Sequence, residues 1–85
     1  MAELMKVQKL EVANIYVPAK RRTTLDPKKV DEIAESMLAS GQLTPIMVRA
    51  DGARFVLVEG LHRLEACKAL GEAKINGILV QARRN

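Results

Sequence analysis

Length, composition and charge restrict this chain to a small folded unit and exclude several classes of protein. Its 85 residues, 48% hydrophobic and 28% charged, fit one domain of ordinary folded composition. With one Tyr and one Phe, the chain lacks an aromatic platform on which successive bases of a single-stranded nucleic acid could stack. No apolar run is long enough to span a bilayer, and the first residues lack the apolar core of a signal peptide. A single cysteine cannot form an internal disulfide, and together with a single histidine it cannot complete a tetrahedral zinc site within one chain. Because no disulfide is possible, we expect a reducing, cytoplasmic location, and we expect no contact with a membrane.

The positive charge is concentrated in one segment. The net charge is +4, and the segment from Pro18 to Val30 accounts for all of it, because its only acid is Asp26 and its cations are Lys20, Arg21, Arg22, Lys28 and Lys29. The rest of the chain is neutral. Two interpretations stay open: a solvated basic loop, or a strip that faces phosphate groups.

The first half of the chain predicts one strand and one helix. A short strand is expected from Val7 to Val12, followed by a turn at Asn14. Asp26-Pro27 is typical of a helix start, because Asp accepts hydrogen bonds from free N–H groups and Pro fits the first helical position. Gly41 is expected to end this helix. Between them, helical spacing places five apolar residues in one stripe: Val30, Ile33, Ala34, Met37 and Leu38.

The second half predicts a hairpin, a helix and a last strand. The runs Thr44–Arg49 and Arg54–Val58 are rich in β-formers, and the intervening Asp51-Gly52 suits a tight hairpin turn. A helix is expected over Leu61–Leu70 and a strand over Ile75–Gln81. The order β-α-β-β-α-β predicts a small single-domain α+β (α/β) fold with a mixed sheet.

The transition from FVLVE to GLHRLEACKALG carries the clearest functional signal. A helix start favours an anion, since its N–H groups are free and its dipole is positive there. Gly60 lets the backbone approach that anion closely. His62 and Arg63 lie in the first turn, where positive side chains are unfavourable unless an anion is bound. Arg63 is expected at the surface, where its guanidinium can bind phosphate through two N–H groups. His62 is expected to donate a hydrogen bond or to carry a positive charge. The alternative is that both are solvated.

Two further residues near this turn carry chemistry. Glu59 precedes the glycine and could hold Mg²⁺ or accept a proton from an attacking hydroxyl; the alternative is a strand-end carboxylate paired with Arg54 or Arg63. Cys67 lies nearly two helical turns beyond Leu61 and shares its face, which predicts core packing rather than a nucleophile.

From about Val7 to Val80 the chain resembles the ParB/sulfiredoxin superfamily, specifically the ParB-like N-terminal domain of the type also labelled "ParB-like nuclease". The resemblance rests on a strand ending in VP, the basic KRR, the helix DPKKVDEIAESMLASG, the segment QLTPIMV and the stretch FVLVEGLHRLEACKALG. Gly60, Arg63 and Ala66 match the G-E-R-R-x-R-A box of the partition proteins. The resemblance implies one ParB-like domain over residues 1–85, with its core at about 7–81.

The resemblance also implies a nucleotide site. It points to a nucleoside triphosphate, CTP or ATP, with Mg²⁺, cradled by Gly60, His62 and Arg63 and by the basic loop. In that loop the matching positions are Arg21 or Arg22, with Thr23 or Thr24 as hydroxyl donors. Leu61 replaces the cysteine of the sulfiredoxins and the Glu of the partition box, while His62 and Glu65 replace two Arg of that box. The sulfiredoxin reaction therefore lacks its nucleophile.

Three functions follow from this resemblance as alternatives. The first is a nucleotide-binding domain associated with DNA partition or regulation, as a monomer or weak homodimer, with DNA, a further domain or a partner protein as additional partners. The second is an ATP- or ADP-dependent phosphotransferase of the sulfiredoxin or serine-kinase type. The third is a protein-interaction domain whose pocket has decayed. Nuclease activity is disfavoured because no carboxylate cluster suits two-metal cleavage.

Overall fold

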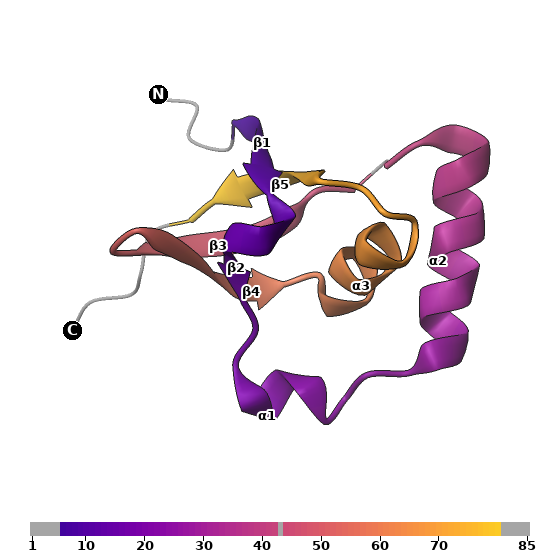
Figure 1. Cartoon of the computed structure of the whole chain (residues 1–85), viewed down its shortest axis with the longest axis horizontal. Coiled ribbons are helices and arrows are strands. Elements are labelled where there is room, and N and C mark those ends of the chain that lie inside the picture. The colour runs from indigo at the N-terminus through magenta and orange to yellow at the C-terminus, as the bar shows by residue number, and fades with distance from the viewer. Residues whose placement is uncertain (1–5, 43, 81–85) are drawn as a thin grey trace.

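A computed structural model describes residues 6–42 and 44–80 of the chain. They form a five-stranded sheet, two longer helices and two short helical turns (Figure 1). In chain order the elements are β1 (Val7–Glu11), the 3-10 turn η1 (Val12–Asn14), β2 (Ile15–Tyr16), α1 (Ala19–Arg22), α2 (Pro27–Ser40), β3 (Ile46–Asp51), β4 (Arg54–Glu59), α3 (Leu61–Ala69) and β5 (Lys74–Leu79). Within the described ranges, no helix is long and apolar enough to cross a membrane.

The sheet is mixed, with the strand order β1-β5-β3-β4-β2. β1 pairs with β5 and β3 pairs with β4 in antiparallel fashion, whereas β3 and β5, and β2 and β4, run parallel. The predicted hairpin is present, and Gly52 in its turn has a φ of +62°. The predicted fold class, α+β with a mixed sheet, is confirmed.

The core lies between one face of the sheet and α3. Its most deeply buried side chains come from three strands and this helix: Ile46, Val48, Leu57, Leu64, Cys67 and Ile75. In Figure 1, α3 lies between the sheet and α2. α2 is therefore an outer layer, and none of its residues is fully buried. The predicted inward face of α3, with Leu61, Leu64 and Cys67, is confirmed.

Two elements were not predicted from the sequence. β2 has two residues, too few to show the alternation that identifies a strand, and it exists through its parallel pairing with β4. The basic segment predicted as a loop contains the four-residue helix α1, which starts after Pro18. β3 begins at Ile46 rather than at the predicted Thr44, and β5 begins at Lys74 rather than at Ile75. The predicted end of this last strand, Gln81, lies outside the described residues.

The predicted ends of α2 are confirmed, whereas one residue of its predicted apolar stripe, Leu38, lies at the surface. Asp26 accepts a hydrogen bond from the N–H of Lys28 at 3.1 Å, and Gly41 follows the helix with a φ of +78°. Leu38, however, is 73% exposed. The other members of the stripe are half-buried, and α2 packs against α3.

Candidate functional site

The turn between β4 and α3 has a backbone that requires glycine. Gly60 has a φ of +110°, in the region that L side chains rarely adopt. A Cβ at this position would lie 2.6 Å from Cγ2 of Ile46, a fully buried core residue. No side chain caps the first turn of the helix that follows. The turn is thus held against the core while its first backbone N–H groups have no side-chain acceptor.

This turn forms one wall of an open cleft of about 500 Å³. α2 forms the other wall with Lys29, Glu32 and Ile33, and the turn contributes residues 59–63. The structure therefore brings together the predicted residues Glu59, Gly60, His62 and Arg63. Lys29 and Glu32 were assigned no site role from the sequence, because only packing of α2 beside α3 brings them to the turn. Two sequence features could have pointed to these residues. Lys29 belongs to the basic segment, and its helical spacing places it on the same side of a helix as Glu32 and Ile33.

Arg63 was predicted at the surface, but its side chain is partly enclosed by the protein. Its side chain is half-buried, and its Nε atom is fully buried without a hydrogen-bond partner among the described residues. Arg63 lines the cleft and also a second cavity of about 200 Å³, next to Ser36, Gln42 and Thr44. A buried guanidinium N–H without an acceptor is unfavourable, which makes Arg63 a candidate ligand for an anion in the cleft.

His62 forms one hydrogen bond that the sequence did not predict, and it forms it as an acceptor. Its Nε2 accepts a hydrogen bond from the backbone N–H of Asp26 at 3.0 Å. An imidazole whose Nε2 accepts carries its proton on Nδ1. His62 therefore joins the start of α3 to the residue that precedes α2 and holds the two walls of the cleft together.

Four residues of the basic segment that were predicted to contact the ligand do not line the cleft. Arg21 and Arg22 are exposed in α1 and do not line it. The hydroxyls of Thr23 and Thr24 donate to the carbonyl oxygens of Lys20 and Arg21, each at 2.8 Å. These two hydroxyls, predicted as donors to a ligand, use their protons within the helical turn and retain only acceptor capacity.

The cleft combines charges of both signs. Lys29 and Arg63 supply positive charge, and Glu32 and Glu59 supply carboxylates. Among the described residues Glu59 forms no ion pair; Arg54, one partner considered for it, is bonded to Asp51 at 3.0 Å instead. Mg²⁺ is commonly held by one or two carboxylates together with substrate phosphates, which fits this pair. The described residues contain no group of three or more metal-ligating side chains, so a metal held by protein ligands alone has no site there.

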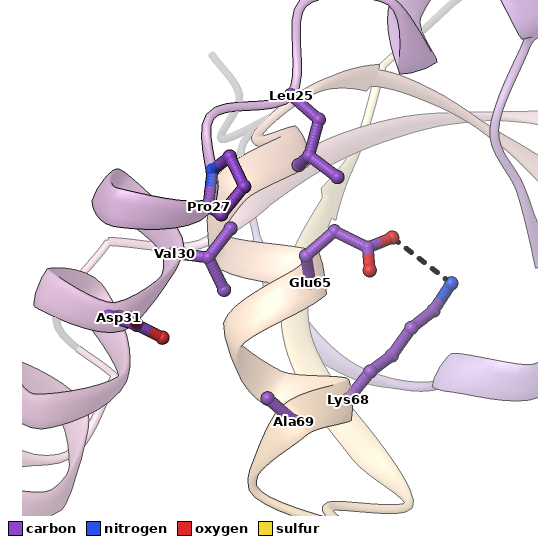
Figure 2. Close-up of a pocket in the computed structure, with 7 residues that line it drawn as sticks. All are labelled: Leu25, Pro27, Val30, Asp31, Glu65, Lys68 and Ala69. Carbon is purple, nitrogen blue, oxygen red and sulfur yellow. Dashed lines mark hydrogen bonds and ion pairs between the residues drawn. The ribbon is translucent and has the colours of Figure 1, made fainter.

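Glu65, which replaces an Arg of the partition box, faces away from the cleft. It lines a shallow groove on the outer side of α2 and α3 and pairs with Lys68 at 3.3 Å (Figure 2). The substitution therefore removes a positive charge from the helix without adding an acid to the cleft.

Cys67 is a core residue, as predicted. Its side chain is 2% exposed, and its Sγ lies 3.4 Å from the carbonyl oxygen of Lys74. Burial raises the pKa of the thiol, and the negative charge of Glu72 raises it further. A thiol held protonated in the core is a poor nucleophile.

Comparison with known proteins decides the family. The model of the ParB N-terminal domain matches residues 1–85. The chain belongs to the ParB N-terminal domain family. The chromosome-partitioning protein ParB of Myxococcus xanthus is 35% identical over 74 residues, which are 86% of this chain and 25% of that protein. The chain thus spans about a quarter of the length of this curated relative.

Solved structures share the fold of this ParB N-terminal domain. Sulfiredoxin from Arabidopsis thaliana superposes with a TM-score of 0.81 at 27% identity, over 91% of this chain and 86% of the enzyme. The C-terminally truncated ParB of Caulobacter crescentus, complexed with CTP-γ-S, superposes with a TM-score of 0.79 at 18% identity, over 92% of this chain and 46% of that one. The sulfiredoxin likeness covers most of both chains.

Proposed function

We propose that the chain is a nucleotide-binding domain of a partition-related protein and that it binds a nucleoside triphosphate, CTP or ATP, with Mg²⁺ in the cleft between α2 and the Gly60 turn. The observation that carries this proposal is the buried, unpartnered Nε of Arg63 beside an uncapped helix start. An anion with several acceptor oxygens suits both the positive guanidinium of Arg63 and the free N–H groups of the turn.

The remaining cleft residues have complementary roles in this proposal. Lys29 supplies a second positive charge from the opposite wall. Glu59 and Glu32 hold Mg²⁺ together with the phosphates, and the ion supplies charge neutralisation of the phosphate oxygens. The basic α1 segment, with exposed Arg21 and Arg22, lies outside the cleft; it contacts either a protruding part of the nucleotide or the phosphate backbone of DNA.

The cellular role rests on the longer relatives. The ParB protein of Myxococcus xanthus is named for chromosome partitioning, and the chain covers a quarter of its length. We place this domain in partition or regulation of DNA, where nucleotide binding controls contacts with DNA, another domain or a partner protein. Its state as a monomer or weak homodimer, and its cytoplasmic location, stay predictions.

Isothermal titration calorimetry with CTP, ATP, ADP and GTP, each with Mg²⁺, tests the proposal. The wild-type chain is expected to bind at least one of them, and Arg63→Ala should lose affinity by about tenfold or more, since charge-assisted bonds to phosphate are lost. Arg54→Ala is the matched control, because this arginine pairs with Asp51 away from the cleft. Equal binding by Arg63→Ala, with its fold confirmed by circular dichroism, contradicts the site. Absence of binding by either protein contradicts the function and favours an interaction domain with a decayed pocket.

The position of Glu59 favours a phosphotransferase as the second candidate. This carboxylate lines the cleft and forms no ion pair in the described part of the chain, so it is available to take the proton of an attacking hydroxyl. In that reaction the nucleotide transfers a phosphoryl group to a small hydroxyl compound such as free serine. A Glu59→Gln variant should then bind nucleotide but lose transfer, measured with radiolabelled ATP. Binding without any transfer by the wild-type chain favours the binding domain.

A further inference from the structure

The helix α2 is held to the rest of the protein without any fully buried residue. Its charged side chains take part in neither of the two ion pairs of the described residues. Segments with few buried apolar contacts separate from a fold at a low cost in free energy. The hydrogen bonds at the two ends of α2 therefore carry much of its attachment. Between those ends, packing against α3 relies on four half-buried apolar residues: Val30, Ile33, Ala34 and Met37.

The two ends of α2 are attached to different extents. After its last turn, the side-chain amide of Gln42 accepts a hydrogen bond from the N–H of Asn76 at 2.8 Å and donates one to the carbonyl oxygen of Asn76 at 3.1 Å. Both bonds are partly buried and tie this end to β5. Before the first turn, a single exposed bond of 3.0 Å joins the N–H of Asp26 to Nε2 of His62. The other hydrogen bonds of the segment between α1 and α2 join it only to these two helices. The start of α2 is therefore the more weakly attached end.

The start of α2 also lies beside two hollows that share no lining residue. One is the candidate cleft of about 500 Å³, to which α2 contributes Lys29, Glu32 and Ile33. The other is the groove of about 390 Å³ between the first turns of α2 and the body of α3 (Figure 2). The hollows beside the end of α2 are smaller, about 200 and 300 Å³. Atoms beside empty space have fewer contacts to lose, so the start of α2 is displaced more easily than its end.

We propose that α2 is a movable wall of the cleft, anchored at its end by Gln42 and latched at its start by the hydrogen bond between Asp26 and His62. With the latch closed, Lys29 on α2 and Arg63 on α3 lie on opposite walls and contact one ligand together. With the latch open, the start of α2 moves away from α3, and the cleft widens so that a ligand enters or leaves. The proposal rests on the function given above for the identity of that ligand, a nucleotide. The movement itself is a property of the ligand-free chain.

Double electron–electron resonance on the ligand-free chain tests the proposal. One pair of nitroxide labels is placed on Lys28→Cys, at the start of α2, and Arg49→Cys, in the central strand β3. Arg49 lies on the sheet face away from the helices, because the neighbouring Val48 belongs to the core. A second pair combines Ser40→Cys, at the end of α2, with Arg49→Cys. The native Cys67 is buried and stays unlabelled.

The labelled start of α2 should show a main distance to β3 and a second, longer one, whereas the labelled end should show a single distance. His62→Leu removes the acceptor of the latch and should raise the fraction of the longer distance about two- to fivefold, as expected for the loss of one hydrogen bond. His62→Gln keeps an acceptor and should restore the wild-type distribution.

Asn14→Ala is the matched control variant. Asn14 also forms one exposed hydrogen bond between a side chain and a distant backbone group, because its Nδ2 donates to the carbonyl oxygen of Ala53 at 3.1 Å. This bond lies in the sheet and not at α2, so its loss should leave both distance distributions unchanged.

Three results overturn the proposal. The first is a single distance from the start of α2 in both the wild-type chain and His62→Leu. The second is an equal gain of longer distances at the two ends of α2, because the end is then not anchored. The third is an effect of His62→Gln or Asn14→Ala as large as that of His62→Leu, because the hydrogen bond to Asp26 is then not the latch. These measurements use no nucleotide, so a failure to bind nucleotide in the calorimetric test contradicts the proposed function and not the movement.

Discussion

The two long helices begin in opposite ways. α2 starts behind Asp26, whose own carboxylate accepts the N–H of Lys28. α3 starts behind Gly60, without any side-chain cap. His62, in the first turn of α3, accepts the N–H of Asp26 and so serves the start of α2. The start of α2 is therefore satisfied from within the protein, whereas the start of α3 keeps free N–H groups beside the cleft.

The bodies of the two helices differ as well. α2 buries none of its residues, and α3 buries four: Leu61, Leu64, Ala66 and Cys67. Local sequence signals define α2, and packing against the sheet defines α3. Substitutions at α3 are therefore expected to affect stability through the core, and substitutions at the start of α2 through local hydrogen bonds.

The largest expected effect is at the glycine before α3. Gly60→Ala forces a side chain into a positive φ and places its Cβ 2.6 Å from Ile46, so we expect a loss of roughly 3 kcal/mol in the free energy of unfolding. Gly52→Ala is the matched control. Its φ is also positive, but a Cβ there meets nothing within 4 Å, and the cost should be about 1 kcal/mol. Urea unfolding measures both, and similar losses for the two variants contradict the contact with Ile46.

The second effect tests the buried face of α3. Cys67→Ala removes a core side chain and should cost roughly 1–2 kcal/mol in urea unfolding while nucleotide binding is retained. The folded state raises the pKa of the thiol. The stabilisation that the Cys67 side chain gives to the folded state is therefore complete at pH values below the pKa of the unfolded thiol. Above about pH 9 the unfolded chain releases the proton and the folded chain keeps it, so this contribution falls as pH rises. The stability difference between wild type and Cys67→Ala should narrow above that pH; a constant difference contradicts the raised pKa.

The third effect concerns the cap of α2. Asp26→Ala should lower the free energy of unfolding by about 1 kcal/mol, because the N–H of Lys28 loses its acceptor. Asp26→Asn keeps a side-chain oxygen at this position and should remain close to wild type. Chemical denaturation distinguishes them, and an equal loss in both variants would show that the charge, and not the hydrogen bond, matters.

The smallest expected effect is at the contact between the two helix starts. His62→Leu removes the acceptor for the N–H of Asp26 and should cost about 0.5–1 kcal/mol. His62→Gln retains an acceptor at a similar reach and should recover part of that loss. Thermal melting at pH 8 compares the two, and full stability of His62→Leu would show that water replaces the contact.

Much of the fold could be predicted from local patterns. Asp26-Pro27 and Gly41 mark the ends of α2 because capping depends on neighbouring residues. The Asp51-Gly52 hairpin follows from turn chemistry in the same way. β2 and the exposed position of Leu38 could not be predicted, because the first depends on pairing with β4 and the second on how α2 packs against α3.

One wall of the candidate cleft follows from chain order alone, because Glu59, Gly60, His62 and Arg63 are neighbours along the chain and share one turn. The other wall depends on packing, which brings Lys29 and Glu32 to the turn from about thirty residues away. The packing of the helices also gives Nε2 of His62 its backbone donor, Asp26, and buries the Nε of Arg63. This division arises because capping and turn formation are governed by adjacent residues, whereas hydrogen-bond partners and burial depend on which elements the core brings together.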